Sequence, residues 1–159
     1  MDYMNIGRSF SILHRRSQLF VTAACEHLKL SYSEYVMLMR IFASEGLSQE
    51  ELSSTLFLDK AVVTRTISLL EQKGMVYREK DARDQRMKRL YPTEQAKEER
   101  EYLEGIIYAW VDYLQQGMPR EEAEAIAKGF LMASERASQA NIPELVRRMG
   151  KREADSLEE

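Results

Sequence analysis

The chain has 159 residues, of which 44% are apolar and 31% are charged, and its formal net charge is −3. A chain of this length can form one compact domain with a hydrophobic core. No apolar run approaches the roughly 20 residues of a membrane-spanning helix. Charged residues also interrupt every candidate signal-peptide core near the N-terminus. We therefore expect a cytoplasmic protein that does not bind membranes.

The sequence offers little material for metal binding or catalysis. Its one cysteine, Cys25, excludes an internal disulfide and a cysteine-rich zinc site. His14 and His27 are the only histidines, and on one helix they would lie on nearly opposite faces. We find no nucleophile motif, no phosphate-binding glycine loop and no metal-ligand spacing. We predict that the protein is not an enzyme and needs no cofactor.

Two helices are predicted in the N-terminal part of the chain. Apolar residues recur at three- and four-residue spacing across residues 3–28, which indicates one long helix. Ser31 and Glu34 have the spacing of a capping box and begin a second helix, which ends near Ala43. The expected buried face of this second helix consists of Tyr35, Leu38, Ile41 and Phe42.

A short helix and a longer one follow after a tight turn. Ser48 and Glu51 form a second capping box, and the helix they begin ends near Thr55. Asp59 is the expected N-cap of the next helix, which covers residues 60–73 and ends at Gly74. Its core-facing residues are expected to be Val63, Ile67 and Leu70.

After Gly74 the pattern changes to that of two short strands. The runs 75–80 and 87–91 flank a charged turn at residues 81–86, which predicts a β-hairpin. Thr93 is the expected cap of a helix over residues 94–115, and Gly117 and Pro119 separate it from another over residues 120–137. The predicted fold is therefore mainly α with a small β-hairpin.

Positive charge is concentrated in one part of this acidic chain. Residues 59–92 contain nine basic and five acidic side chains, a local charge of +4, which leaves −7 for the rest. Phosphate contacts supply much of the affinity of DNA-binding proteins, so a local basic face indicates a DNA-binding surface. The nine basic residues are Lys60, Arg65, Lys73, Arg78, Lys80, Arg83, Arg86, Lys88 and Arg89.

A helix pair followed by a charged hairpin is the order of a winged helix-turn-helix. The second helix of such a pair enters the major groove, and its exposed face needs donors and small side chains. We expect major-groove contacts from Lys60, Ala61, Val62, Thr64, Arg65 and Ser68. In the hairpin loop, the wing, we expect Arg86 to enter the minor groove with Asp84 holding its guanidinium. Phosphate contacts are expected from Arg83, Lys88 and Arg89, and Arg83 is also expected to hold the flanking minor groove together with Arg86.

The stretch Leu47–Glu98 resembles the MarR family of bacterial regulators. The resemblance rests on a helix ending at Gly74, an Asp-x-x-Asp-x-Arg wing at Asp81, Asp84 and Arg86, and a long helix beginning at Thr93-Glu94. The order and lengths of the flanking predicted helices also agree, so the resemblance covers roughly residues 5–140. The second wing strand, with Lys88 and Arg89, is more basic than such strands usually are.

The resemblance implies a homodimer in which long terminal helices intertwine and the two wings straddle a near-palindromic operator on double-stranded DNA. It also implies that a small ligand between the dimer helices and the DNA-binding lobe can alter the spacing of the two recognition helices. We expect a repressor with an aromatic or anionic effector. The candidate ligand residues are His14, Arg15 and Tyr35.

We divide the chain on this basis. Residues 1–30 and 94–142 are the expected helical dimerisation region, because their helices carry more apolar surface than a small domain can cover. Residues 31–93 are the expected winged helix-turn-helix lobe. Residues 143–159 are expected to be a tail with a short helix followed by a flexible end.

Two alternatives stay open at this point. Some members of the family sense oxidants through a cysteine in the first helix, and Cys25 could have that role, although its neighbours are typical of a core. A winged helix can also serve as a protein-interaction module without a groove-binding face. For Trp110, Tyr108 and Tyr113, packing between helices is favoured over a ligand cage.

Overall fold

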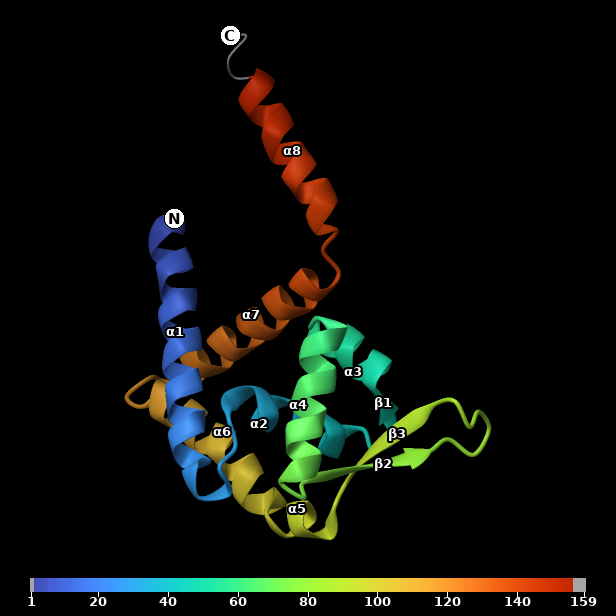
Figure 1. The fold of residues 1–159 in the computed structure, drawn as a ribbon. Helices are drawn as coiled ribbons and strands as arrows, with labels where there is room; N and C mark the ends of the chain where they lie inside the picture. The colour runs from blue at the N-terminus through green and yellow to red at the C-terminus, as the bar shows by residue number, and fades with distance from the viewer. Residues whose placement is uncertain (1, 156–159) are drawn as a thin grey trace. The chain divides into compact units, whose positions relative to one another are not determined.

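The computed structural model describes residues 2–155, with side chains up to Gly150 (Figure 1). The chain forms two compact units, Met1–Leu114 and Gln115–Glu159. The elements in chain order are α1 (Tyr3–Ala24), a 3-10 turn (Glu26–Leu28), α2 (Tyr32–Ala43), β1 (Leu47–Ser48), α3 (Gln49–Leu56), α4 (Lys60–Gln72), β2 (Val76–Lys80), β3 (Lys88–Pro92), α5 (Glu94–Glu98), α6 (Arg100–Gln115), α7 (Arg120–Ser138) and α8 (Ile142–Asp155).

The predicted fold class, mainly α with a small β-hairpin, is confirmed, and the sheet has one strand more than expected. Strands β2 and β3 pair antiparallel, with Tyr77 opposite Tyr91. The two-residue strand β1 pairs with the other edge of β3, so β3 is the central strand. A strand of two residues is too short to show a period-two pattern, which explains why the sequence did not reveal it.

The four predicted helix N-caps are confirmed. Ser31 and Ser48 each accept a hydrogen bond from the backbone N–H of the glutamate three residues later, and that glutamate bonds back to the serine N–H. Asp59 accepts from the Ala61 N–H, and Thr93 accepts from the Ala96 N–H. These caps satisfy backbone donors that a helix leaves unpaired in its first turn.

Two predicted helices are interrupted in the structure. The helix over residues 3–28 ends at Ala24 and continues as a 3-10 turn, which Lys29 ends by adopting a left-handed backbone conformation with φ of 56°. The helix over residues 94–115 is divided at Glu99 into α5 and α6. Neither break is marked by glycine or proline, the residues that most often interrupt a helix. In the tail, α8 has 14 residues and includes positions 151–155, where a flexible end was expected. The remaining part of that expectation, residues 156–159, lies outside the described residues.

The core of the first unit lies where α2, α3 and α4 meet the sheet. Every residue expected on the inner face of α2 and α4 is buried, including Leu38, Ile41, Val63, Ile67 and Leu70. Figure 1 shows α4 alongside α3, with the β2–β3 hairpin extending away from the helices. Within residues 2–155, no helix is both long enough and apolar enough to cross a membrane.

A buried ion pair attaches the C-terminal end of α4 to the start of α2. The Lys73 ammonium, at the C-cap of α4, donates to Glu34 Oε1 at 2.5 Å and to the Lys29 carbonyl at 2.6 Å. Burial alone would raise the pKa of Glu34, but hydrogen bonds from Lys73 and Ser31 outweigh it, and the pKa is lowered. Glu34 is therefore ionised at neutral pH and holds two helices together.

We predict that Glu34→Gln lowers the free energy of unfolding by about 2 kcal/mol at pH 7, since a charged hydrogen bond in a buried place is lost. The folded-state pKa of Glu34 lies below its usual value of 4.5. The stabilisation that Glu34 provides is therefore complete above pH 4.5 and is lost as the pH falls through the folded-state pKa. Urea unfolding at a series of pH values measures this.

The matched control is Glu98→Gln, which changes an exposed glutamate of α5. It should leave the free energy of unfolding within about 0.5 kcal/mol of the original. A difference between the original protein and Glu34→Gln that stays constant from pH 7 to pH 3 would contradict the role given to Glu34.

Candidate nucleic-acid interface

The face of α4 opposite the core is exposed and carries small and basic side chains. Ala61, Thr64 and Arg65 are exposed, while Val62 and Ser68 are half-buried and Val62 also packs against the core. The Thr64 hydroxyl donates to the Lys60 carbonyl at 2.8 Å, and the Ser68 hydroxyl donates to the Thr64 carbonyl at 3.0 Å. Lys60 is exposed and pairs with Glu50 at 2.6 Å. The residues expected to contact a groove thus lie on the exposed side of α4, and the half-buried Val62 and Ser68 lie at its margin.

The turn between α3 and α4 is closed by its own hydrogen bonds. The Ser53 hydroxyl donates to the Leu58 carbonyl at 2.6 Å, and the Leu58 N–H donates to the Ser53 carbonyl at 3.1 Å. Phe57 adopts a left-handed backbone conformation with φ of 54° and ends α3. The two helices are therefore held at a defined angle, which fixes where the exposed face of α4 points.

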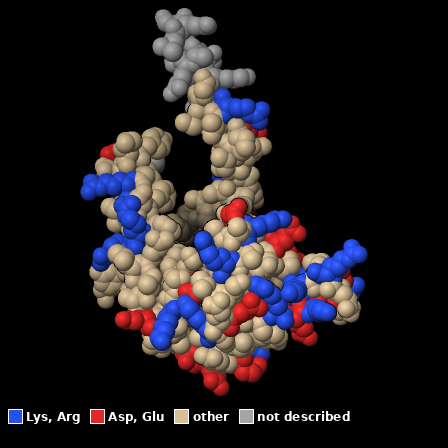
Figure 2. All heavy atoms as spheres, in the orientation of Figure 1, with Lys and Arg blue, Asp and Glu red and all other residues tan. Residues whose placement is uncertain are grey.

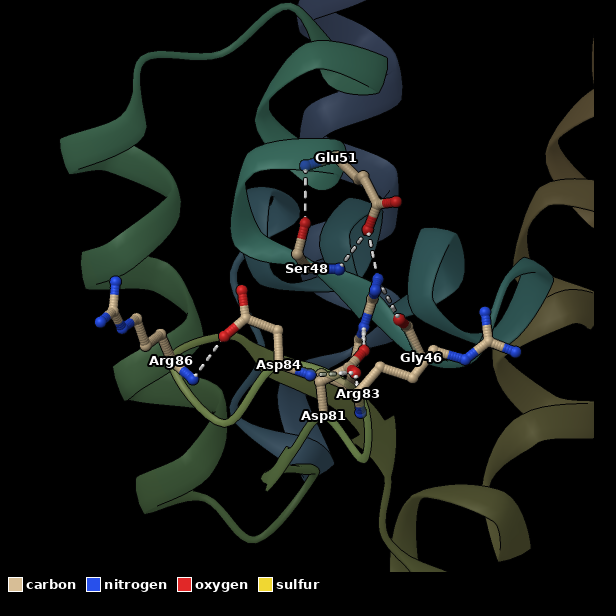
Figure 3. A network of polar contacts seen from close by, with 8 residues as sticks. Gly46, Ser48, Glu51, Asp81, Arg83, Asp84 and Arg86 are labelled. Atoms are coloured by element: carbon tan, nitrogen blue, oxygen red, sulfur yellow. Dashed lines mark hydrogen bonds and ion pairs between the residues drawn. The ribbon is translucent and has the colours of Figure 1, made fainter.

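The hairpin loop between β2 and β3 is ordered by two aspartates (Figure 3). Asp81 Oδ1 accepts hydrogen bonds from the backbone N–H groups of Arg83 at 2.7 Å and Asp84 at 3.1 Å. The backbone also closes the loop, since Asp81 N–H donates to the Met87 carbonyl and Met87 N–H donates to the Asp84 carbonyl. This wing therefore has a defined loop conformation in the free protein.

The predicted contact between the Asp84 carboxylate and the Arg86 guanidinium is not the one observed. Asp84 Oδ1 instead accepts from the backbone N–H of Arg86 at 3.0 Å. A two-residue separation in a tight turn places the carboxylate beside the backbone N–H, as in the usual aspartate turn. Figure 3 shows the Arg86 side chain extending away from Asp84. The guanidinium is thus left available at the loop.

Arg89 is not available for the phosphate contact expected of it. Its Nε donates to Asp81 Oδ2 at 2.6 Å, and its Nη1 donates to Glu51 Oε2 at 2.9 Å and to the Gly46 carbonyl at 3.2 Å. The hydrogen bond from Arg89, with those from the Arg83 and Asp84 N–H groups, lowers the pKa of Asp81 to about 2. The Glu51 pKa is also lowered, mainly by its bonds with Ser48.

The structure separates the nine basic residues of positions 59–92 into two sets. Four form ion pairs: Lys60 with Glu50, Lys73 with Glu34, Arg78 with Glu71, and Arg89 with both Asp81 and Glu51. The other five have no ion-pair partner among the described residues, and all are exposed. Figure 2 shows Lys and Arg side chains gathered over the hairpin. The unpaired set consists of Arg65, Lys80, Arg83, Arg86 and Lys88.

Comparison of the sequence with known proteins relates this chain to a family. Residues 30–88 match the model of the MarR family. Over 93 residues the chain is 28% identical to the HTH-type transcriptional regulator YybA of Bacillus subtilis, a match that covers 58% of this chain and 62% of that protein. The chain therefore matches less than two thirds of this relative's length.

Solved structures agree in fold. A MarR transcriptional regulator from Methanosarcina mazei superposes with a TM-score of 0.80 at 27% identity, covering 84% of this chain and 96% of that one. The chain carries a MarR-family winged helix-turn-helix domain. A MarR-family protein of Listeria monocytogenes, solved in complex with 26mer DNA, has the same fold, with a TM-score of 0.76 at 20% identity over 82% of this chain and 87% of that one.

The candidate ligand residues of the chain lie in different surroundings. Tyr35 is buried, and its hydroxyl donates to the Leu103 carbonyl at 3.0 Å. His14 and Arg15 are exposed on α1, and the His14 ring lies edge-on to Tyr32 with 6.0 Å between centroids. No hydrogen bond, ion pair or ring contact joins the three within residues 2–155.

A groove between α1 and α6 lies within the first unit and has a volume of about 660 Å³. Trp110 lies in its wall, stacks on Phe20 at 5.0 Å between centroids, and donates from Nε1 to the Ser17 hydroxyl at 2.8 Å. Tyr113 also stacks on Trp110, with 5.7 Å between ring centroids. The packing between helices expected for Trp110 is observed, whereas Tyr113 stacks on a residue of its own helix and both Tyr113 and Tyr108 are exposed. Phe20 and Arg16 also line the groove, and the helical spacing of α1 could have singled them out.

Cys25 lies in the core and is fully buried. Burial raises the pKa of its thiol to about 11, whereas an oxidant-sensing cysteine needs an accessible thiolate. The surroundings of Cys25 therefore favour packing over oxidant sensing.

We predict that Cys25 in the folded protein reacts with a disulfide reagent at pH 8 at least about a hundredfold more slowly than in the unfolded chain. A rise in pKa from 9 to about 11 lowers the thiolate fraction by this factor, and burial adds to it. The chain in denaturant serves as the reference rate. Equal rates in the folded and unfolded protein would restore the oxidant-sensing alternative.

Proposed function

We propose that this chain is a DNA-binding transcription regulator, a repressor that binds a near-palindromic operator as a homodimer. The observation that carries the proposal is the exposed face of α4 beside a wing whose Arg83 and Arg86 have no ion-pair partner among the described residues. Lys73 and Arg89 are held in pairs that are largely buried, whereas unpaired cations can neutralise phosphates, and so can Lys60, because both side chains of its pair with Glu50 are exposed. A winged helix without a nucleic-acid partner has no need of such a surface.

The roles follow from the geometry of major-groove binding. Thr64 and Arg65, at the exposed centre of α4, are assigned to base edges and adjacent phosphates, with Lys60 and Ala61 at the N-terminal end of the helix. Val62 and Ser68, which are half-buried, are assigned to the margin of this contact. Arg86 and Arg83 are assigned to the minor groove and Lys88 to phosphate. Asp84 acts through the loop backbone that carries Arg86.

The relatives support a role in regulation. The Bacillus subtilis protein is named as a transcriptional regulator, and the Listeria monocytogenes protein is complexed with DNA. At 20% identity the second likeness concerns the fold alone. The assignment of DNA contacts therefore rests on this chain's own exposed cations and on the shape of its winged domain.

We predict that Arg86→Ala and Arg65→Ala each weaken binding to a specific operator by about ten- to a hundredfold, because each removes a contact with a base or phosphate. The probe is labelled duplex DNA from beside the chain's own gene, titrated by fluorescence anisotropy between about 50 and 200 mM salt, a range over which phosphate contacts weaken strongly. Loss of one phosphate contact should also reduce the salt slope by about one.

Lys97→Ala is the matched control, since it removes an exposed cation from α5, outside α4 and the wing. It should leave affinity unchanged. If the original protein does not distinguish this duplex from random DNA, the claim of sequence specificity fails. If charge reversal at Arg86 has no effect on function, the protein-interaction alternative is favoured instead.

The proposed dimer follows from apolar side chains that a single chain leaves in solvent. Such residues lie along α1, α6 and α7, the long helices of the proposed dimerisation region, residues 1–30 and 94–142. Apolar patches of this extent usually mark an interface. We therefore assign dimerisation to these helices and DNA binding to residues 31–93. The exposed residues include Ile6, Phe10, Ile107, Val111, Ile126, Phe130 and Leu131.

We predict that the protein sediments at micromolar concentration as a species of twice the chain mass, and that Ile107→Glu shifts it to monomer because a charge would then be buried in the interface. Leu69→Glu is the matched control: Leu69 and Ile107 are both 41% exposed, but Leu69 lies on α4. A stable monomer for the original protein would contradict the proposed dimer.

The proposal includes regulation by a small aromatic or anionic molecule. The α1–α6 groove supports it, because its apolar wall and its volume of about 660 Å³ fall within the usual range of ligand sites. Arg16 on its rim can meet an anionic group. Trp110 is the only tryptophan of the chain, so quenching of its fluorescence by an added aromatic carboxylate tests this part.

A further inference from the structure

Arg89 connects three separate segments of the winged domain. It lies on β3, and its guanidinium donates to Asp81 at the start of the wing loop, to Glu51 in the first turn of α3, and to the Gly46 carbonyl before β1. The Arg89 side chain is 26% exposed and that of Asp81 is 15% exposed. Figure 3 shows Asp81, Glu51 and Gly46 converging on one place.

Both carboxylates of this network also organise backbone. Asp81 Oδ1 accepts from two N–H groups of the wing loop, while its Oδ2 accepts from Arg89. Glu51 Oε2 accepts from the Ser48 N–H at 2.7 Å as part of the α3 capping box. Arg89 therefore links the turn that carries Arg83 and Arg86 to α3, which packs directly against α4.

Local contacts alone hold the wing weakly. The hairpin has two strands of five residues, and β1 adds only two residues to its other edge. Such short strand pairs are marginally stable in isolation. A planar guanidinium can donate to several acceptors at once in a fixed geometry, whereas a lysine ammonium is a compact point charge that lacks this fork.

We propose that Arg89 is a positioning residue, which holds the wing in a fixed orientation relative to α3 and α4 and makes no phosphate contact of its own. This inference rests on the proposed DNA-binding function for its effect on affinity. Orienting the wing before binding saves the cost of ordering it in the complex. The negative charge of Asp81 by itself repels DNA, but its ion pair with Arg89 holds the wing in this orientation.

Asp81→Asn separates this role from a direct phosphate contact. The asparagine oxygen can still accept from the Arg83 and Asp84 N–H groups, so the turn is kept while the charge that pairs with Arg89 is lost. If Arg89 positions the wing, Asp81→Asn weakens DNA binding although it removes a negative charge. If Arg89 contacts phosphate, the same substitution frees the guanidinium and tightens binding.

The experiment measures operator affinity against salt for the original protein, Arg89→Gln, Arg89→Lys, Asp81→Asn and the Arg89→Gln/Asp81→Asn double variant. We expect about tenfold weaker binding for each single variant, from the cost of ordering the loop. The double variant should be no weaker than Arg89→Gln, and the salt slope should stay unchanged. Tighter binding by Asp81→Asn, additive losses, or a slope reduced by about one in Arg89→Gln would overturn the proposal.

Lys88→Gln is the matched control. Lys88 is the neighbour of Arg89 on β3, is exposed, and has no ion-pair partner among the described residues. As an assigned phosphate contact, it should show the opposite pattern to Arg89→Gln, with a salt slope reduced by about one.

Amide hydrogen exchange in the free protein gives a readout that does not depend on DNA. The Asp81 and Met87 N–H groups, which close the wing loop, should exchange several-fold faster in Arg89→Gln and Asp81→Asn and at the original rate in Lys88→Gln. Unchanged exchange in Arg89→Gln would overturn the positioning role. If the original protein binds no DNA, the proposed function fails, while the exchange rates still decide whether Arg89 orders the wing.

Discussion

Helix α4 has to give one face to the core and leave the opposite face to solvent, and the winged domain depends on this division. Val63, Ile67 and Leu70 are fully buried, which fixes the rotation of the helix about its axis. Asp59 caps its first turn, and Lys73 attaches its last turn to Glu34 and to the Lys29 carbonyl. The exposed side of the helix therefore has a defined direction before any partner binds.

Ion pairing likewise divides the charged side chains into those that bind other parts of the protein and those that stay exposed. The chain is acidic as a whole, yet its fold pairs some cations with carboxylates and leaves others exposed. Lys73 and Arg89 act within the protein, one at the end of α4 and the other at the base of the wing. Arg83 and Arg86 stay without such partners among the described residues, and both lie on a loop ordered by Asp81 and Asp84. The proposed DNA-binding surface thus consists mainly of cations that have no carboxylate partner among the described residues.

Much of the fold could be predicted because its signals are local. The capping boxes at Ser31 and Ser48 and the caps at Asp59 and Thr93 depend on residues two or three positions apart, and all four are confirmed. The break at Glu99 and the strand β1 were missed, since neither has a composition that sets it apart from its neighbours. The α4 face was predicted from helical spacing, which also accounts for the half-buried positions of Val62 and Ser68 at its margin.

The sequence by itself determined the order of the elements, the helix starts, the inner face of α4, the basic character of residues 59–92 and the resemblance to a family that residues 30–88 then matched. These features follow from spacing along the chain, which backbone geometry converts directly into helix faces and turns. Only the tertiary structure decided which cations are paired, because Arg89 meets Glu51 across 38 positions and Lys73 meets Glu34 across 39. Partners so far apart in sequence are brought together by the packing of the core, and no local pattern encodes that choice.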